Sequence, residues 1–485
     1  MRKILLCFLF CLTAFQARAN DPFADWTGKT IGVQLGTSGD TLATASPLVQ
    51  TERYNKAGDA VQSLLNGKID AVLIDDAPAK VFAAQNPALA VVQKDFEKED
   101  YAFAVAKENA ALTKQIDRAV QTLRDDGTLD KIAATYLATP ENERVPYQSP
   151  ANVKYDGELR IATNATFPPY EYYHDGQIVG IDIDIARAVA DLLGKKAVIT
   201  DMEFDAIIPA VASGKADMGA AGMTVTEERR QNVDFSVPYT RAQQVFLVRG
   251  KASAGAGMKF SQRFETDFIK DARWKYLADG LKNTLIITAL AVSLGIALGG
   301  LIAVVCASHD INGSFKAGNF ICRAYLAVIR GTPVMIQLLI MYYVVFASVG
   351  VNKMLVAILA FGLNSAAYVA EIIRSGIASV DSGQLEAGRS LGFSFFRTMR
   401  HIILPQAFKN VLPALANEFI VLLKETSVCG YIGLTDLTRG GDIIRSITYD
   451  AFLPLASVAL IYFSMVFALT RFTTKLEKRL KRNER

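Results

Sequence analysis

The pattern of hydrophobic and polar positions divides the chain into two parts of different character. From about Asp25 to Gly250, short apolar and β-branched runs alternate with longer stretches of helical periodicity. From Leu281 onward, the apolar runs are much longer and are separated by short polar segments. The first pattern is typical of a folded α/β region outside a membrane, and the second is typical of membrane-spanning helices.

The first part predicts strands that alternate with helices. Such alternation favours α/β lobes in which ligand-facing loops follow the strand ends. The expected strands are Thr30–Gln34, Ala71–Ile74, Tyr101–Val105, Leu159–Ala162, Lys196–Thr200, Met218–Ala221 and Gln243–Val248.

The second part predicts five membrane spans, because about 20 apolar residues cross a hydrocarbon core. An odd number of spans places the two flanks of this block on opposite sides of the membrane. The tail after the last span is rich in Lys and Arg, so it is expected in the cytoplasm, with everything before Leu281 outside. The expected spans are Thr284–Cys306, Thr332–Ser348, Met354–Ile373, Val411–Cys429 and Phe452–Thr470.

The N-terminus predicts export. A basic Met1-Arg2-Lys3 is followed by the apolar Ile4–Phe15 and then by Ala17-Arg18-Ala19, which together are typical of a cleaved signal peptide over residues 1–19. The cysteines that remain after cleavage show neither a disulfide framework nor metal-ligand spacing.

Composition changes this picture little. The chain has 485 residues, 51% of them hydrophobic, and a formal net charge of +4, which allows two or three domains. No basic stripe is interleaved with aromatic residues, so nucleic acid is not an expected partner. The three histidines are scattered and no nucleophile elbow occurs, so an enzyme is not expected either.

A short polar segment between apolar runs carries the first resemblance. Glu386-Ala387-Gly388-Arg389-Ser390-Leu391-Gly392, followed by Leu404-Pro405, resembles the coupling loop of ATP-binding-cassette (ABC) importer permeases. The resemblance implies that a separate cytoplasmic ATPase docks on residues 382–406, with Glu386, Ala387 and Gly392 on the contacting helix. A connector helix whose small residues merely allow close packing is the alternative. Arg330-Gly331-Thr332-Pro333 resembles the R-G-T-P signature of permeases for polar amino acids.

No phosphate-binding G-x-x-x-x-G-K-[ST] loop occurs in the sequence. We therefore expect no cofactor on this chain and ATP hydrolysis on the partner subunit. A transport path needs two permease halves, so a homodimer or a related permease subunit is expected. The resemblance implies a multi-pass protein of the bacterial plasma (inner) membrane, in contact with lipid.

The exported part resembles the periplasmic binding proteins for polar amino acids, with the halves in reverse order. Asp156–Gly250 resembles the first lobe of that fold, and Trp26–Ala138 resembles the second lobe with its closing helix. One circularly permuted, two-lobed receptor is the simplest interpretation, since permutation is tolerated where chain ends lie close together. The alternative is a pair of truncated receptors without a working cleft.

The expected fold is therefore multidomain, with an α/β two-lobed receptor followed by an all-α permease domain of five spans. The expected boundaries are a signal peptide (1–19), the second receptor lobe with its closing helix (20–138), a linker (139–155), the first lobe (156–250), a flexible tether (251–279), the permease domain (280–475) and a basic tail (476–485).

The same resemblance implies a site for a free amino acid, which needs a cation for its carboxylate and an anion for its ammonium. Arg229 matches the family arginine that binds the carboxylate, although its neighbour Arg230 stays a candidate. Asp75 matches the family anion. The other matching positions are Thr224 and Gly222 beside the carboxylate, Thr37 and Ser38 in a helix-opening turn, and Phe167 and Phe204 as aromatic walls.

Two positions bear on which amino acid is bound. Asn164 stands where receptors for basic amino acids often carry an acid, and Gln34 stands where the glutamine-binding branch can place a lysine. Together they favour a neutral polar amino acid, with glutamine first. The function expected from the whole chain is the substrate-binding and membrane-spanning subunit of an ATP-driven importer. An amino-acid-gated ion channel, or a receptor with degenerate transport activity, is the alternative.

Overall fold

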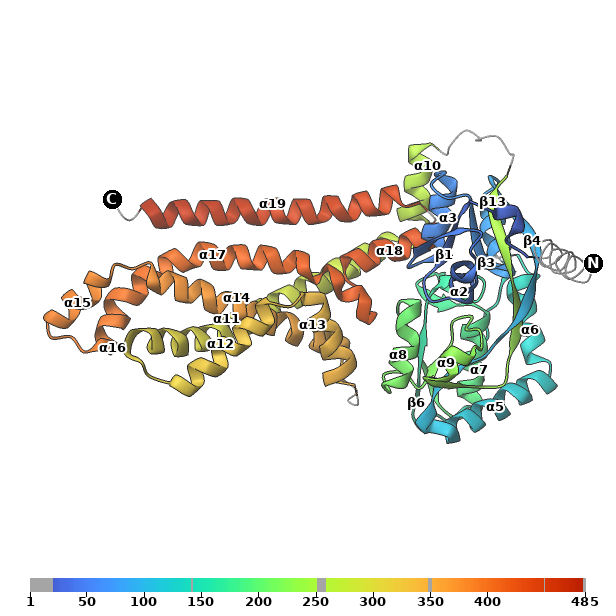
Figure 1. Ribbon diagram of the computed structural model, residues 1–485, viewed down its shortest axis with the longest axis horizontal. Coiled ribbons are helices and arrows are strands. Elements are labelled where there is room, and N and C mark those ends of the chain that lie inside the picture. Colours follow the sequence, from blue (N-terminus) through green and yellow to red (C-terminus); the bar gives the residue numbers. More distant parts are fainter. Residues whose placement is uncertain (1–20, 141–142, 251–258, 348–350, 449, 483–485) are drawn as a thin grey trace, which may run out of the picture. The chain divides into compact units, whose positions relative to one another are not determined.

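The computed structural model describes residues 21–140, 143–250, 259–347, 351–448 and 450–482. They form two compact units, the first comprising the chain up to Thr266 with Ser446–Ala451, and the second Asp267–Arg445 with Phe452–Arg485. Figure 1 shows sheets and short helices in the first unit and long helices in the second. The expected signal peptide and residues 251–258 of the expected tether lie outside the described residues.

The first of the two compact units is called the receptor unit below. Its first sheet builds one lobe. Its strand order is β2-β1-β3-β13-β4, where β1 runs parallel to β2 and β3, and β13 runs antiparallel to β3 and β4. Every residue of β3 is buried, as expected of a central strand covered on both faces. The bounds are β1 Thr30–Gln34, β2 Gln50–Tyr54, β3 Ala71–Asp75, β4 Leu89–Tyr101 and β13 Thr240–Arg249, with helices α2 Ser38–Ala45, α3 Ala57–Leu65 and α4 Asp76–Gln85.

The second sheet builds the other lobe in the same way. Its order is β10-β6-β11-β5-β12, with β6 parallel to its two neighbours and β5 antiparallel to β11 and β12. The strands are β5 Ala104–Ala106, β6 Glu158–Thr163, β10 Lys196–Asp201, β11 Met218–Gly219 and β12 Val233–Phe235. The helices are α5 Ala110–Asp125, α6 Thr128–Leu137, α7 Ile181–Leu192, η4 Phe204–Ala206, α8 Ile207–Ala212 and α9 Glu227–Arg230. A small sheet of β7 Thr166–Phe167, β8 Glu171–His174 and β9 Gln177–Val179 adjoins it.

The two lobes exchange strands. β13 follows the strands of the second sheet in sequence but lies between β3 and β4, while β5 follows β4 but lies between β11 and β12. The chain crosses between the lobes near Tyr101 and near Tyr239, and the Tyr239 amide donates to the Tyr101 carbonyl over 2.9 Å. Neither sheet is complete without the other half of the sequence. The two halves therefore form one receptor and not two truncated ones.

This exchange changes the extent of each lobe. The lobes expected from the sequence, 20–138 and 156–250, meet at the linker, whereas the sheets change over near residues 101–104 and 239–240. The closing helices α5 and α6 pack on α7 and so belong with the second sheet. The boundaries of the lobes are set by pairing between strands distant in sequence, and local residue patterns do not predict that pairing.

The linker between the two halves is bound to α7. The Tyr147 amide donates to Asp184 over 2.7 Å, and its hydroxyl donates to Asp191 over 3.1 Å. Asp184 also accepts a hydrogen bond from Tyr136 of α6 over 2.7 Å. The closing helix and the linker thus share one anchor, which holds the junction against the lobe.

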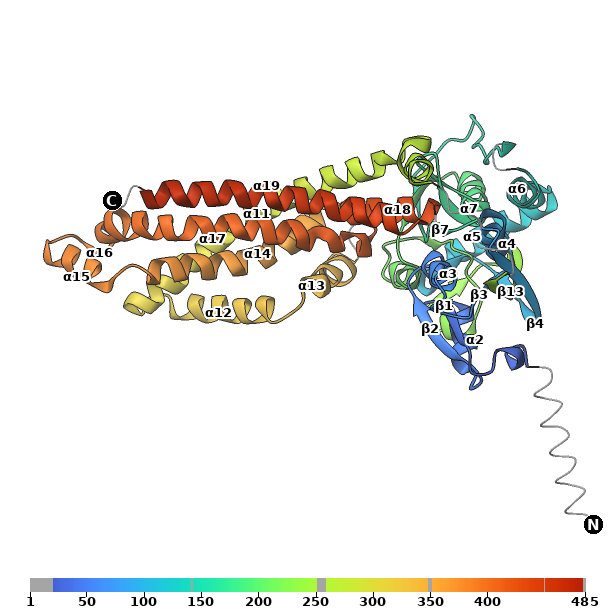
Figure 2. The same ribbon diagram turned by 90° about the horizontal axis from the view of Figure 1, so that it is seen from above.

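The second unit consists of helices. Its elements are α11 Trp274–Asn312, α12 Lys316–Arg330, α13 Val334–Ile340, η7 Met341–Val345, α14 Lys353–Ala378, α15 Ser382–Ser390, α16 Phe395–Thr398, η8 Met399–Ile403, α17 Leu404–Glu425, η9 Thr426–Ile432, α18 Leu437–Thr448 and α19 Phe452–Arg482. Figures 1 and 2 show α11, α14, α17 and α19 running side by side. A Cβ on Gly299 of α11 would lie 2.7 Å from the Ala366 carbonyl oxygen of α14, so glycine allows these two helices to approach closely.

The described helices correct the expected spans. Three of them, α11, α14 and α19, are long and apolar enough to cross a membrane, and a fourth span exists if α12 and the α13–η7 segment count as one. These two segments meet at a bend of 107° just before α13, so α13 and η7 fall within the expected span Thr332–Ser348, while α12 precedes the bend and was not expected as part of a span. Pro333 lacks an amide hydrogen and disfavours a helical residue before it, which accounts for the break. The expected fourth span falls on α17 and η9, and α17 is long enough, with 22 residues, but less apolar than the helices that could cross a membrane.

The described part of the expected tether is helical. Residues 260–272 form α10 Phe260–Phe264, η5 Glu265–Ile269 and η6 Lys270–Ala272, and α11 already begins at Trp274. A flexible segment over the whole of 251–279 is therefore not what the structure shows for these residues.

Candidate functional site

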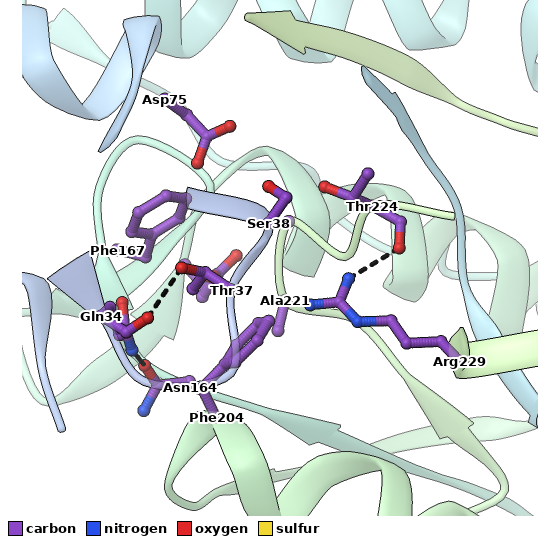
Figure 3. Close-up of a pocket in the computed structure, with 12 residues that line it drawn as sticks. Gln34, Thr37, Ser38, Asp75, Asn164, Phe167, Phe204, Ala221, Thr224 and Arg229 are labelled. Atoms are coloured by element: carbon purple, nitrogen blue, oxygen red, sulfur yellow. Dashed lines mark hydrogen bonds between the residues drawn. The ribbon is translucent and has the colours of Figure 1, made fainter. Parts of the chain in front are cut away.

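A narrow pocket lies between the two lobes of the receptor unit. All ten ligand-binding residues predicted from the sequence line it. Figure 3 labels nine of them, all except Gly222, and shows them converging from both lobes. The lining residues are Gln34, Thr37, Ser38 and Asp75 from the lobe of the first sheet, and Asn164, Phe167, Glu171, Phe204, Ala221, Gly222, Thr224 and Arg229 from the lobe of the second sheet.

Strand ends and one helix start position the side chains that the lobe of the first sheet contributes. β1 ends at Gln34, β3 ends at Asp75, and Gly36 turns the chain with a φ of +75°. Thr37 then caps α2, its hydroxyl oxygen accepting the Asp40 amide over 3.3 Å. The parallel strands β1 and β3 deliver these groups to the same edge of the sheet, where ligands of α/β folds bind.

Arg229 places a cation at one side of the pocket. Thr226 caps the short helix α9 and accepts the Arg229 amide over 3.2 Å. The guanidinium donates to the Thr224 carbonyl over 2.6 Å and, across the cleft, to the Gly36 carbonyl over 2.8 Å. It lies 5.4 Å from the ring centre of Phe204.

The neighbouring arginine has a different environment. Arg230 lies 3.8 Å from Glu227 and stacks over Phe235, and it is not among the pocket residues. The geometry thus separates the two candidates and places only Arg229 in the pocket.

Asp75 provides a buried carboxyl group in the pocket. It accepts a hydrogen bond from the Gln244 amide group over 2.9 Å, and only 7% of its surface is exposed. Burial, with a smaller contribution from the charge of Glu99, raises its pKa to about 8. A nearby ammonium group would lower this pKa again and hold the carboxylate in its charged form.

Glu99 is not among the predicted site residues, yet it joins the two lobes. Its Oε2 atom accepts the hydroxyl groups of Ser38 and Thr224, each over 2.6 Å. Both residues are among the predicted site residues, Thr224 beside the ligand carboxylate and Ser38 in the helix-opening turn. Glu99 stands in the charged segment Asp95-Phe96-Glu97-Lys98-Glu99-Asp100, which is typical of an exposed strand, so no local signal singles it out.

Glu171 is a second acid in the pocket that is absent from the prediction. It begins β8, and only 1% of its surface is exposed. Within the described part of the chain, neither of its carboxylate oxygens has a hydrogen-bond partner. Burial, together with the charges of Asp182, Asp75 and Asp201, raises its pKa well above the ordinary value.

Two of the predicted contacts are engaged within the protein. Asn164 accepts the Gln34 amide over 3.1 Å and the Thr166 hydroxyl over 2.9 Å, and it donates to the Met202 carbonyl over 2.8 Å. The Gly222 amide, expected near a ligand carboxylate, donates to Asp182 over 2.7 Å. Asn164 and Gly222 therefore shape the pocket while their hydrogen bonds are directed elsewhere.

The predicted coupling segment forms a surface of the helical unit. Glu386 and Ala387 are exposed on α15, and Gly392 ends the turn after it with a φ of +84°. The Phe393 amide donates to the Gly388 carbonyl over 3.1 Å, which is the Schellman end of a helix. Leu391 is 77% exposed and Phe396 is 70% exposed, so the segment presents apolar side chains as well as Glu386.

Comparisons with known proteins agree with this architecture. The family model for bacterial extracellular solute-binding proteins, family 3, matches residues 159–427, which is more than half of the chain. The arginine transport system permease protein ArtQ of Bacillus subtilis is 37% identical over 211 residues, which cover 43% of this chain and 94% of that protein. The glutamine transport system permease protein GlnP of Escherichia coli K12 is 34% identical over 208 residues, which cover 42% and 93%.

A solved amino acid ABC transporter, crystallised with histidines, shares 43% sequence identity over 44% of this chain and 98% of its own, with a TM-score of 0.41. The relatives among the curated proteins are transport permeases, so a transporter subunit and not an enzyme is indicated. The chain belongs to the family 3 solute-binding proteins and, through its helices, to the permeases of polar amino acid ABC transporters, with both parts in one membrane polypeptide.

Proposed function

We propose that this chain captures a polar amino acid between its receptor lobes and passes it through its membrane helices, driven by ATP hydrolysis on a separate ATPase. One observation supports this above the others, namely that a guanidinium and a buried carboxyl group, Arg229 and Asp75, line one pocket between the lobes. This pair complements the carboxylate and the ammonium that every free amino acid carries.

The assembly follows from what the chain contains. Two copies, or one copy and a related permease subunit, form the path, and the ATPase docks on α15 and the turn after it, through Glu386, Ala387 and Gly392. ATP is then bound only by the partner. The basic residues at the end of α19 favour a cytoplasmic C-terminus, with the receptor on the outer face of the bacterial plasma membrane.

Closure of the lobes is the step that couples binding to transport. A ligand that bridges Arg229 on one lobe and Asp75 on the other favours the closed state by its differential affinity for it. The two chain crossings near Tyr101 and Tyr239 lie side by side, and they are the places where such a motion bends the backbone.

Calorimetry on the full chain in lipid nanodiscs tests this function, with the common polar amino acids as ligands. We expect binding of at least one of them, weakened about 100-fold or more by Arg229→Ala, because a charge-assisted bidentate contact is lost. Arg230→Ala is the matched control and should change the affinity little. Retained affinity in the Arg229 variant would refute the site.

The transport partner needs a separate experiment. Co-purification of an ATPase with the tagged chain would support the importer, whereas a chain that conducts ions on ligand addition without an ATPase would support the alternative of a ligand-gated channel.

A further inference from the structure

We propose that the pocket selects an amino acid whose side chain carries a positive charge, with Glu171 as the counter-charge of that side chain. This inference rests on the proposed function and specifies its substrate class. It departs from the preference for a neutral side chain that Asn164 and Gln34 suggest in the sequence.

The first argument is the state of Glu171. Its carboxyl group lines the pocket, is almost fully buried, and has no hydrogen-bond partner within the described residues. The charged groups that act on it are all acids, Asp182, Asp75 and Asp201. A buried carboxyl group in such surroundings either keeps its proton or meets a cation, and the pocket is where a cation can reach it.

The second argument is the balance of charge in the pocket. Arg229 is matched by the carboxylate of a bound amino acid, and Asp75 is matched by its ammonium. Glu171 is then the lining acid left without a partner. A neutral side chain on the ligand leaves Glu171 without a partner, whereas a guanidinium or ammonium side chain pairs with it.

The third argument removes the reason for a neutral ligand. Asn164 has its side-chain oxygen and nitrogen engaged by Gln34, Thr166 and Met202. It therefore supports the wall of the pocket and is not free to identify an amide on the ligand. The aromatic rings of Phe167 and Phe204, which also line the pocket, are compatible with a flat cationic group through cation–π attraction.

The charges at the entrance to the pocket also favour a cation. A larger hollow that shares Ser38, Phe204, Thr224 and Arg229 with the pocket is lined by many more acids than bases. Asp40 is paired with Arg53, and Asp100 with Arg241, but the remaining acids still favour the approach of a cation. The acids are Asp21, Asp40, Asp95, Glu97, Glu99, Asp100, Asp205 and Glu228, and the bases are Lys98 and Arg229.

The test compares L-arginine with L-citrulline, which has nearly the same shape but a neutral urea in place of the guanidinium. Calorimetry on the full chain in nanodiscs should show arginine binding at least about tenfold more tightly than citrulline. Glu171→Gln, which keeps the size of the side chain, should remove most of this difference by weakening arginine and leaving citrulline nearly unchanged. Glu97→Gln, an exposed acid at the entrance, is the control and should leave the ratio within about threefold.

Equal or tighter binding of citrulline by the unmodified chain would overturn the inference. This comparison uses no variant, so its outcome does not depend on whether a variant folds. An unchanged ratio in the Glu171 variant would overturn it as well. Binding of glutamine and citrulline without arginine would overturn this inference and leave the proposed function intact, whereas binding of none of the common polar amino acids would overturn both.

Discussion

Ser38 and Thr224 lie on different lobes of the receptor, yet their hydroxyl groups donate to the same atom, Oε2 of Glu99, each over 2.6 Å. The carboxylate of Glu99 thus engages the Thr224 hydroxyl, which is expected to donate to the carboxylate of a bound amino acid. A ligand that accepts from the Thr224 hydroxyl must first break its hydrogen bond to Glu99.

Removing Glu99 should therefore tighten binding. We expect Glu99→Ala to increase the affinity for L-arginine and for L-glutamine by about tenfold or more, because the hydrogen bond from Thr224 to Glu99 no longer has to be broken and a hydrogen bond to a charged group is worth roughly 1.5–3 kcal/mol. Glu97→Ala, two residues earlier on β4 and exposed, is the matched control in the same calorimetric measurement. Weaker binding in the Glu99 variant would mean that this carboxylate assists the ligand instead of competing with it.

The affinity should also depend on pH through Asp75. Burial raises its pKa to about 8 in the empty pocket, so at pH 7 roughly a tenth of the molecules carry the charge that an ammonium group needs. Binding should release a proton below pH 8, and the affinity should rise as the pH increases from 6 toward 8 and then level off. The groups acting on Asp75 are Glu99, Asp76 and Tyr101, with Gln244 donating to it.

Calorimetry in buffers of different ionisation enthalpy measures this proton release directly. In Asp75→Asn the Asp75 contribution to the release should disappear while overall affinity falls, because the amide cannot charge. A release unchanged by this substitution would assign the titration to another acid in the pocket.

The receptor site shows how far local sequence patterns extend. β1 and β6 fall within a residue of their expected ends, and the ten pocket residues are those whose short motifs match the binding-protein family at strand ends and one helix start. Those motifs work because each one fixes its own turn or cap, as Gly36 and Thr37 do before α2.

Other features depend on partners distant in sequence. The side chain of Glu99 acquires its role only because Thr224, 125 positions away, is brought against it. β13 completes a sheet whose other strands precede it by more than a hundred residues. Glu171 begins β8 within a tyrosine-rich run, and its burial depends on how the small sheet packs. Such contacts form only when distant parts of the chain pack together, and no local pattern in the sequence predicts them.

The backbone at Gly222 should tolerate no side chain. Its φ is +54°, and a Cβ there would lie 3.1 Å from a ring carbon of Tyr101 and 3.2 Å from one of Phe167. Gly222→Ala should lower the free energy of unfolding of the receptor by about 2–4 kcal/mol, adding the strain of a left-handed conformation to overpacking, and should weaken ligand binding by displacing Phe167. Thermal unfolding and calorimetry measure the two effects.

Gly214→Ala is the control for the strain alone. Gly214 also has a positive φ, +72°, but a Cβ there would meet no atom within 4 Å. Gly214→Ala should lower the free energy of unfolding only by the strain of the left-handed conformation, about 1–2 kcal/mol, and should leave the ligand affinity unchanged. Equal effects of the two substitutions would show that crowding against Phe167 contributes nothing.

The proposed ATPase contact can be separated from ligand binding. Leu391 is 77% exposed beside Gly392, at the end of the coupling helix, where an apolar side chain is expected to be buried by a partner. Leu391→Asp should abolish co-purification of the ATPase and ligand-stimulated ATP hydrolysis, while calorimetry shows unchanged affinity for the amino acid. Val145→Asp, at a similarly exposed aliphatic residue (73%) of the receptor linker, should leave both activities intact. A carboxylate buried at position 391 without a partner would be too costly for a complex that docks on this helix. Normal co-purification of the ATPase with the Leu391 variant would therefore show that the docking surface lies elsewhere.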